Sequence, residues 1–299
     1  MLKNLIKEKY QHPEEQYLSL IRELLAEANL ETGRNGEVYR NIGACMYFSL
    51  ENNKIPILTT KKVAVKTCLK ELLWFIRGST DNKILKNQGV KIWNANASVD
   101  FLKSRSLPYE EDDLGPVYGH QWRHFNAPYT SCEDDYANKG VDQLQNVIRD
   151  LKNPDTRYSR RHVITAWNPC QLDNMALPPC HIMFQFHVTR GDKLSCSLYQ
   201  RSGDVGLGVP FNILSYSALT HLIAHHCELE PYEFIYHLGD THIYHDHFDG
   251  LNKQLTRKPL PFPTLKIFER KSDIESYELD DFIIENYSYH EPIKMTMSA

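Results

Sequence analysis

Residues 182–200, IMFQFHVTRGDKLSCSLYQ, decide the fold. Two short runs rich in branched and aromatic side chains, 182–188 and 194–200, flank the turn-forming segment TRGDK. This pattern predicts two strands joined in a hairpin. A third β-prone run, HVITAW, precedes them at 162–167. We therefore expect a β-sheet at the centre of the fold.

Helical periodicity surrounds these strands. Apolar side chains recur on one face in the segments 13–29, 65–77, 140–151 and 213–228, which are expected to be helices. Because strands and helices do not alternate regularly, we expect one α+β domain that spans residues 1–299. Two irregular polar stretches are expected to be surface insertions, at 99–112 and 129–140.

Composition excludes several classes of protein. The 34 Lys and Arg against 38 Asp and Glu give a net charge of -4, which argues against general binding to nucleic acid or anionic membranes. The apolar run 72–76 is too short to cross a bilayer, so we expect a soluble, unsecreted protein. Seven cysteines without a C-x-x-C pair fit neither a disulfide framework nor a zinc site, and they favour a reducing compartment.

The string MALPPCH at 175–181 is the first candidate for chemistry. Two prolines restrict the backbone before Cys180, and an imidazole, His181, follows it. Nearby positive charge activates a thiol, and Arg160, Arg161 and Arg201 are potential sources of it. The alternative is that Cys180 is a small buried apolar residue, which is the commoner role of a free cysteine.

A second candidate, QRSGD at 200–204, directly follows a predicted strand. Its arginine, hydroxyl and flexible backbone could hold a phosphate, and the alternative is an ordinary polar turn. Asn212 precedes a predicted helix, so its amide would either cap that helix or recognise a base. Both interpretations of each stretch stay open on the residues alone.

The string GDTHIYHDH at 239–247 is rich enough in imidazole and carboxylate to suggest a metal site. It lacks the H-E-x-x-H spacing of a zinc enzyme, so no metal is expected. Hydrogen bonding of His242 and Tyr244 to a sugar hydroxyl is the competing hypothesis. The sequence also contains no G-x-G-x-x-G motif and no P-loop, so neither a Rossmann nor a Walker nucleotide site is supported.

Taken together and in order, these strings resemble the thymidylate synthase family over almost the whole chain. The lengths of 99–112 and 129–140 resemble the longer, eukaryote-type members. The matching strings are PILTTKK (56–62), ELLWFIRGST (71–80), DLGPVYGHQWRHF (113–125), VDQLQ (141–145), AWNP (166–169), MALPPCH (175–181), LYQRSGDVGLGVPFNILSY (198–216), LGDTHIY (238–244) and PIKMTMSA (292–299).

The resemblance implies an activity: reductive methylation of dUMP to dTMP with 5,10-methylenetetrahydrofolate as cosubstrate and reductant, giving dihydrofolate. Cys180 would form a covalent bond to C6 of the uracil ring. Glu71 would organise the proton transfers, and Tyr118 would help to remove the proton from C5. Arg201, Asn212 and Asp204 would also belong to the catalytic set, and no metal would take part.

The resemblance also implies two sets of ligands and a cytoplasmic homodimer, in which one face of a large mixed sheet, covered by helices on the other, forms the interface. Arg160 and Arg161 would reach the phosphate from the second subunit, so the subunits would share their active sites. The other dUMP ligands would be Arg34, Cys180, His181, Gln200, Arg201, Ser202, Asp204, Asn212, His242 and Tyr244. The folate ligands would be Ile92, Trp93, Asn96, Asp204, Leu207, Gly208, Phe211 and Ala299.

Three departures from the family pattern stand out. NGEVYRNIGACM follows Arg34 where a glycine and threonine run is usual, Arg157 could replace one member of the arginine pair, and Asn94 occupies a position where aspartate is common. Two rival functions remain: a pyrimidine hydroxymethylase of the same fold, and a nucleotide-binding regulator that has lost catalysis. Asn212 argues against a cytosine substrate, and the retained Cys180 argues against the regulator.

Overall fold

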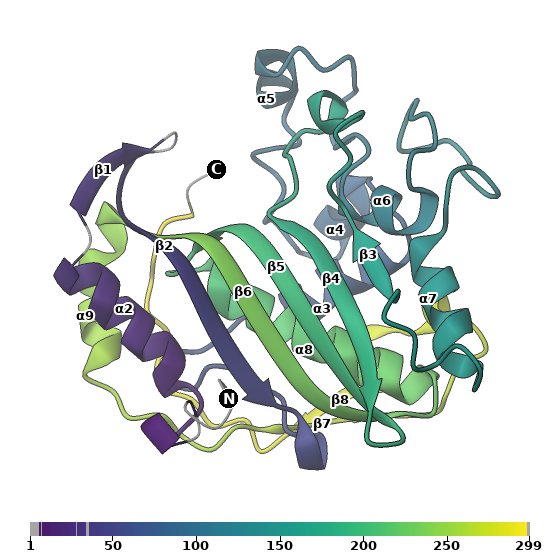
Figure 1. Cartoon of the computed structure of the whole chain (residues 1–299). Coiled ribbons are helices and arrows are strands. Elements are labelled where there is room, and N and C mark those ends of the chain that lie inside the picture. Colours follow the sequence, from purple (N-terminus) through teal and green to yellow (C-terminus); the bar gives the residue numbers. More distant parts are fainter. Residues whose placement is uncertain (1–5, 7, 28, 34–35, 298–299) are drawn as a thin grey trace.

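The computed structural model describes residues 6, 8–27, 29–33 and 36–297. A six-stranded sheet runs through its centre in the order β1-β2-β6-β5-β4-β3 (Figure 1). Neighbouring strands are antiparallel except β5 and β6, which are parallel, so the expected mixed sheet is confirmed. The strands are β1 (Asn29–Gly33), β2 (Gly36–Ser49), β3 (Val163–Thr165), β4 (His181–Thr189), β5 (Lys193–Asp204) and β6 (Glu230–Tyr244).

Helices and a small second sheet complete the α+β fold. The helices are α2 (Glu15–Glu27), α3 (Val65–Ile76), α4 (Asn82–Asn87), α5 (Val99–Ser104), α6 (Tyr118–His124), α7 (Gln143–Lys152), α8 (Gly208–His226) and α9 (Phe248–Leu255). Short 3-10 turns are η1 (Glu51–Asn53), η2 (Leu172–Asn174), η3 (His245–His247), η4 (Ile274–Ser276) and η5 (Leu279–Asp281). Strands β7 (Thr264–Ile267) and β8 (Phe282–Glu285) pair with each other. None of the described helices is long and apolar enough to cross a lipid bilayer.

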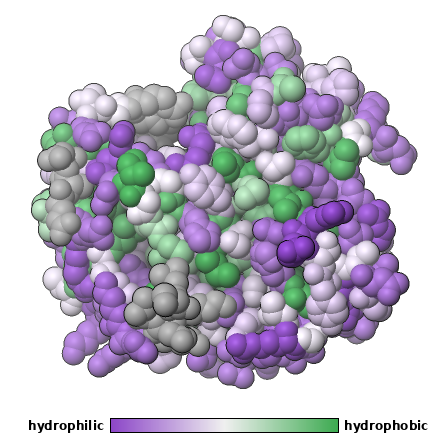
Figure 2. Space-filling model, in the orientation of Figure 1, coloured by the Kyte–Doolittle hydropathy of each residue, from purple (hydrophilic) through white to green (hydrophobic). Residues whose placement is uncertain are grey.

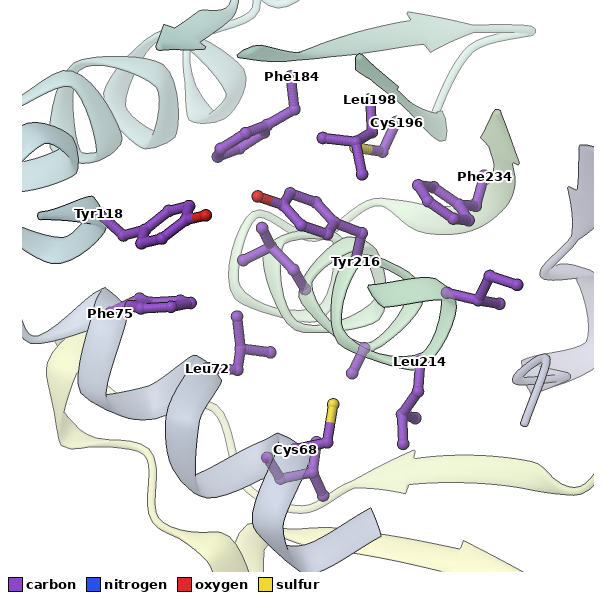
Figure 3. Packing of buried hydrophobic residues seen from close by; sticks show 14 of the residues in the cluster. Cys68, Leu72, Phe75, Tyr118, Phe184, Cys196, Leu198, Leu214, Tyr216 and Phe234 are labelled. Atoms are coloured by element: carbon purple, nitrogen blue, oxygen red, sulfur yellow. The ribbon is translucent and has the colours of Figure 1, made fainter. Parts of the chain in front are cut away.

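The core lies between the sheet and α8. Helix α8 is apolar around its whole circumference because the sheet packs on one side of it and α3 on another. Its Tyr216 contacts Phe184 of β4, with ring centroids 5.3 Å apart. The Tyr216 ring extends from α8 towards Tyr118 and Phe75 (Figure 3). This layer fixes α3 and α6 relative to the ends of the central strands.

The opposite face of the sheet carries large side chains that point away from the core. On β4, Phe184 and Phe186 are buried. Met183, which directly precedes Phe184, is 41% exposed, as the alternation of side chains along a strand requires. Met183 pairs with Tyr199, which is 40% exposed. Figure 2 shows apolar side chains gathered over the middle of this face.

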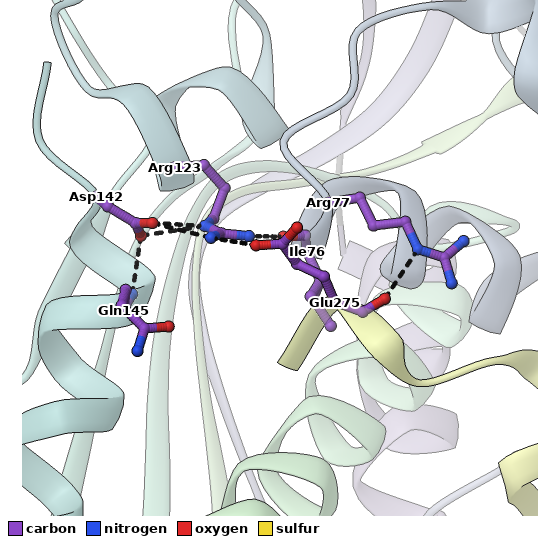
Figure 4. A network of polar contacts seen from close by, with 6 residues as sticks. All are labelled: Ile76, Arg77, Arg123, Asp142, Gln145 and Glu275. Atoms are coloured by element: carbon purple, nitrogen blue, oxygen red, sulfur yellow. Dashed lines mark hydrogen bonds and ion pairs between the residues drawn. The ribbon is translucent and has the colours of Figure 1, made fainter. Parts of the chain in front are cut away.

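An ion network around the buried Arg123 holds α6 against its neighbours. The Arg123 guanidinium donates to the carboxylates of Asp142 and Glu275 at 2.9 and 2.6 Å, and to the carbonyl of Ile76 at 2.7 Å (Figure 4). The fork geometry of arginine suits three acceptors in different directions. This network joins α3, α6, the start of α7 and the C-terminal region.

The predicted hairpin is confirmed, with Thr189 paired to Lys193 across its turn. The expected helices are present, although α8 begins at Gly208 instead of 213. Pro210 lies in its first turn, where a missing N–H costs little. Asn212 is therefore inside the helix, and Leu207 is the N-cap, so the hypothesis that Asn212 caps α8 is wrong.

Candidate active site

Two adjoining cavities open at the end of the sheet where β4 begins. One has a volume of about 460 Å³ and the other of about 580 Å³. Cys180 lines both of them, as do Asn96, Leu177, Ser202 and Asp204. Cys180 therefore stands at the junction of the two cavities.

The backbone around Cys180 is held at several points. Its N–H donates to the Tyr118 hydroxyl at 2.7 Å, and its carbonyl accepts from the Arg201 N–H at 2.9 Å. The Arg201 guanidinium donates to the carbonyls of Pro178 and Pro179 at 3.0 and 2.9 Å. A positive charge is thus fixed against the loop that carries the thiol, the setting in which thiols react as nucleophiles.

A buried carboxyl group lies in the cavity of about 460 Å³, which has the more apolar lining of the two. Glu71 of α3 is 7% exposed, and Trp93 donates to it from Nε1 at 2.7 Å. Burial raises the pKa of Glu71 to about 7, and the Trp93 hydrogen bond opposes that shift. Burial also raises the pKa of the nearby Tyr118 phenol well above its usual value. Glu71 can therefore exchange a proton near neutral pH, whereas Tyr118 keeps its own.

The same cavity contains an amide next to an imidazole. Asn212, in the second turn of α8, is 7% exposed and lines the cavity together with His181. Burial lowers the pKa of His181 to about 4, against a hydrogen bond with Asn212 that favours the charged form. His181 is thus neutral at neutral pH, and its buried Nδ1 has no hydrogen-bond partner within the described part of the chain.

The cavity of about 580 Å³ is more polar. Arg201 and Ser202 of β5 line it opposite His242 and Tyr244 of β6, whose ring centroids are 5.2 Å apart. His242 shares a hydrogen bond of 2.7 Å between Nδ1 and the carboxylate of Asp240. Because Asp240 accepts, it fixes the proton on Nδ1 and leaves Nε2 as an acceptor.

A sequence model described as thymidylate synthase matches residues 15–299. The chain belongs to the thymidylate synthase family. It is 52% identical over 291 residues to the thymidylate synthase of Equine herpesvirus 2, covering 96% of this chain and 99% of that one. It is 49% identical over 298 residues to that of Saccharomyces cerevisiae, covering 96% and 97%.

A third relative is the bifunctional dihydrofolate reductase-thymidylate synthase of Plasmodium chabaudi. It is 50% identical over 298 residues, which are 99% of this chain and 50% of the relative. The chain thus spans about half the length of the two bifunctional Plasmodium relatives, from Plasmodium chabaudi and Plasmodium berghei. Thymidylate synthases are methyltransferases, and the resemblance inferred from the sequence is confirmed.

Most of the residues that the family resemblance implied lie together. Glu71, Tyr118, His181 and Gln200 line the cavity of about 460 Å³, and Cys180, Ser202 and Asp204 line both. The Gln200 side chain is engaged, since it donates to the Ser202 carbonyl at 2.8 Å. The implied folate ligands on the same cavity are Ile92, Trp93, Asn96, Asp204, Leu207, Gly208 and Phe211.

Some of the implied residues line neither cavity, and others lie outside the described part of the chain. Arg160 and Arg161 are exposed just before β3 and line neither cavity. Arg157 also lines neither, and its Nε donates to the Leu151 carbonyl at 3.0 Å. Arg34 and Ala299 lie outside the described residues.

Sequence reasoning missed several residues that line the cavities. Asp240 shares a face of its strand with His242, two positions later, so strand periodicity could have identified it. Arg40 and Arg105 line the cavity of about 580 Å³, and neither belongs to a matching string. Lys61 lines the other cavity, donates to the Gly206 carbonyl, and has its pKa lowered to about 8 by burial, against the attraction of Asp204.

Among residues 6, 8–27, 29–33 and 36–297, no group of three or more His, Cys, Asp or Glu side chains is placed to hold an ion. The histidines of the 239–247 string instead contact their neighbours: His242 bonds Asp240, and His247 Nε2 shares a hydrogen bond of 2.6 Å with the Thr296 carbonyl.

Proposed function

We propose that this protein converts dUMP to dTMP by reductive methylation, with 5,10-methylenetetrahydrofolate as cosubstrate and dihydrofolate as the second product. The observation that carries the proposal is the position of Cys180 at the junction of two cavities. One cavity suits a flat heterocyclic ring, and the other suits a sugar phosphate.

The nucleotide would bind across both cavities. Arg201 and Ser202 would hold the 5′-phosphate together with Arg34, because a guanidinium fork matches phosphate oxygens. His242 would accept a hydrogen bond from the ribose 3′-hydroxyl through Nε2, and Tyr244 would bond the same hydroxyl. These contacts would place the base beside Cys180.

Asn212 would then recognise uracil. Its amide nitrogen donates to O4 and its oxygen accepts from N3–H, a pattern that cytosine reverses. A neutral His181 lies beside it on the same cavity and would support this amide. A buried amide that is matched by one base and mismatched by the other discriminates between them.

The covalent step would begin at Cys180. Its thiolate forms a bond from Sγ to C6, and the electrons of the C5–C6 double bond move towards O4, where the Asn212 amide meets them. C5 thereby becomes a nucleophile. Arg201 supports this step because its charge is fixed against the Cys180 loop.

Two groups would manage the protons. Glu71, with a pKa of about 7, can both hold and release a proton near neutral pH, and it would do so through ordered water at the base. Tyr118 keeps its phenol proton and already accepts the Cys180 N–H, so it lies close enough to assist removal of the proton from C5.

The cavity of about 460 Å³ fits the folate. Trp93, Leu207 and Phe211 offer apolar surface to a flat ring, and Asn96 has a buried amide nitrogen without a partner in the described residues. When bound, the folate supplies the one-carbon unit and the hydride. Met297 lines this cavity, which supports a role for the terminal Ala299 in closing it and excluding water.

The active form would be a homodimer joined through the open face of the sheet. Ile42, Met183 and Tyr199 expose 67%, 41% and 40% of their surface on or beside that face. Arg160 and Arg161 precede its edge strand β3 and are exposed, which supports their proposed role as phosphate ligands of the partner's site. Six cysteines form no disulfide, which supports a cytoplasmic location; they are Cys45, Cys68, Cys132, Cys170, Cys196 and Cys227.

The test is incubation with dUMP and 5,10-methylenetetrahydrofolate, with both products identified by mass. Formation of dTMP and dihydrofolate in equal amounts supports the proposal. Hydroxymethyl-dUMP with tetrahydrofolate would assign the chain to the hydroxymethylase alternative. If the hydrogen at C5 of dUMP is not released at all, the chain has no such catalytic activity.

A further inference from the structure

Arg105 lies just beyond the C-terminus of α5, within the stretch 99–112 that the sequence places at the surface. Its side chain nevertheless lines the cavity of about 580 Å³ together with Arg201 and Ser202. Among the described residues, its buried Nε has no hydrogen-bond partner and its guanidinium forms no ion pair. A buried donor of this kind costs folding free energy unless a ligand satisfies it.

Arg40 and the carboxylates of this cavity are already engaged. Arg40 pairs with Glu31 at 3.4 Å and with Asp240 at 3.2 Å. Asp240 also bonds His242, and Asp204 accepts the Gly206 N–H at 2.8 Å. Arg105 is thus left with a positive charge at this cavity that no ion pair with a described residue offsets.

We propose that Arg105 is a further ligand of the nucleotide 5′-phosphate, supplied by the 99–112 stretch of the same chain. This inference rests on the proposed function. Arg105 shares its cavity with the phosphate candidates Arg201 and Ser202, and it does not line the cavity that holds Asn212 and Trp93. A guanidinium donates two parallel hydrogen bonds to a phosphate, and a dianion is the ligand that satisfies both its charge and its buried Nε.

The test compares dUMP with deoxyuridine, which lacks the phosphate, by calorimetric binding to the full-length chain. Arg105→Gln should raise the Kd for dUMP about tenfold to a hundredfold, because a charge-assisted hydrogen bond is lost. The Kd for deoxyuridine should not change. Arg105→Lys keeps the charge without the fork and should fall between the two. Lys103→Gln is the matched control, because it removes an exposed charge from α5 that lines neither cavity.

Thermal melting separates binding from a structural role. Since Arg105 makes no side-chain bond within the described chain, Arg105→Gln without ligand should melt at or above the wild-type temperature, and only the stabilisation by dUMP should shrink. Three results would each overturn this inference and leave the proposed function standing. They are equal dUMP affinity in wild type and Arg105→Gln, equal losses of affinity for dUMP and deoxyuridine, and a variant that fails to fold. A wild-type protein that does not bind dUMP would overturn the proposed function as well.

Discussion

Cys180 carries the same thiol as the other cysteines, and its surroundings are what distinguish it from them. Burial raises the pKa of Cys196 and of Cys227 to about 12, so both are inert thiols in the core. Cys180 is partly exposed, follows two prolines whose carbonyls hold Arg201, and lines two cavities. The interpretation as a small buried apolar residue thus suits Cys196 and Cys227, whereas Cys180 is partly exposed at the wall of two cavities.

Replacing Cys180 by alanine should reduce turnover roughly a thousandfold or more, because no other group at the junction can form the bond to C6. Binding of dUMP should persist, since the proposed phosphate and base contacts do not involve the thiol. Turnover and calorimetric binding measure the two effects. Cys170→Ala is the control, because Cys170 is exposed and lines neither cavity. A Cys180→Ala protein with a tenth of wild-type turnover would refute the assignment.

Glu71 predicts a dependence of stability on pH. Its pKa is raised from 4.5 to about 7 in the fold, so between these values the folded protein binds one more proton than the unfolded protein. The free energy of unfolding of the wild type should therefore fall with rising pH in this window, relative to the uncharged variant Glu71→Gln. Above the folded pKa the difference should become constant. From about pH 5 to about pH 8 the change should be about 2 to 3 kcal/mol.

Urea denaturation of wild type and Glu71→Gln across this pH range checks the sign as well as the size. Trp93 can still donate to the amide oxygen of glutamine, so the variant keeps that contact. Glu269→Gln is the control, because it changes the same group at an exposed position. A gap between wild type and Glu71→Gln that is the same at every pH would show that Glu71 is not a buried, neutral acid.

At the scale of elements, the catalytic geometry depends on how closely α3 and α6 approach. Gly119 of α6 lies against the end of α3, and a Cβ placed there would come 2.8 Å from the Ser79 carbonyl and 3.1 Å from the Phe75 carbonyl. The adjacent Tyr118 ring packs on Phe75 at 4.8 Å between centroids. Glycine is thus required for α6 to bring Tyr118 close to the helix that carries Glu71.

Gly119→Ala should destabilise the protein by about 1–3 kcal/mol, because the new methyl group meets backbone atoms that cannot rotate away. It should also lower turnover by displacing Tyr118. Chemical denaturation and steady-state kinetics measure these effects. Gly208→Ala serves as the stability control, since its Cβ would meet nothing closer than 3.6 Å. Equal stability of the two variants would mean that α3 and α6 can separate without cost.

The strands show how far periodicity alone reaches. β4 and β5 were predicted because each is a short apolar run next to a clear turn. β6 was not predicted, although Tyr232, Phe234, Tyr236 and Leu238 alternate inward along it. Its polar residues and Gly239 keep the segment from forming a continuous apolar run like those of β4 and β5, and its parallel pairing with β5 is a contact that no local pattern shows.

For the candidate site too, sequence patterns identified only some of the residues. Cys180, Arg201 and Asn212 were identified from strings that resemble the family, whereas their own spacing supported only weak alternatives. Arg40 and Arg105 lie in stretches without such strings, and only the tertiary fold brings them to the cavity of about 580 Å³. The cap interpretation of Asn212 failed because a proline in the first turn of a helix resembles a stop signal in the sequence.

At the scale of the whole molecule, the open face of the sheet forms continuous rows across four strands. Strand pairing aligns Met183, Tyr199, His237 and Cys45 side by side. Met183 and Tyr199 in this row are exposed, and Cys45 and His237 are half-buried; an exposed apolar patch on a sheet face is typical of a protein interface. A second copy of the chain is the proposed partner, since Arg160 and Arg161, just before β3, line neither cavity of their own chain.

Mixing two inactive variants tests this proposal. A chain with Cys180→Ala and a chain with Arg161→Ala would each form inactive homodimers if Arg161 serves the partner's site. In a heterodimer with twofold symmetry, one site combines both replaced residues and the other combines Cys180 and Arg161 intact. Free exchange makes half of the dimers mixed, so about a quarter of wild-type activity should return. Exchange itself is followed by fluorescence transfer between labelled subunits, and two differently labelled Cys180→Ala preparations are the control. If exchange is complete and no activity returns, the sites are not shared, and Arg161 must act within its own chain or not at all.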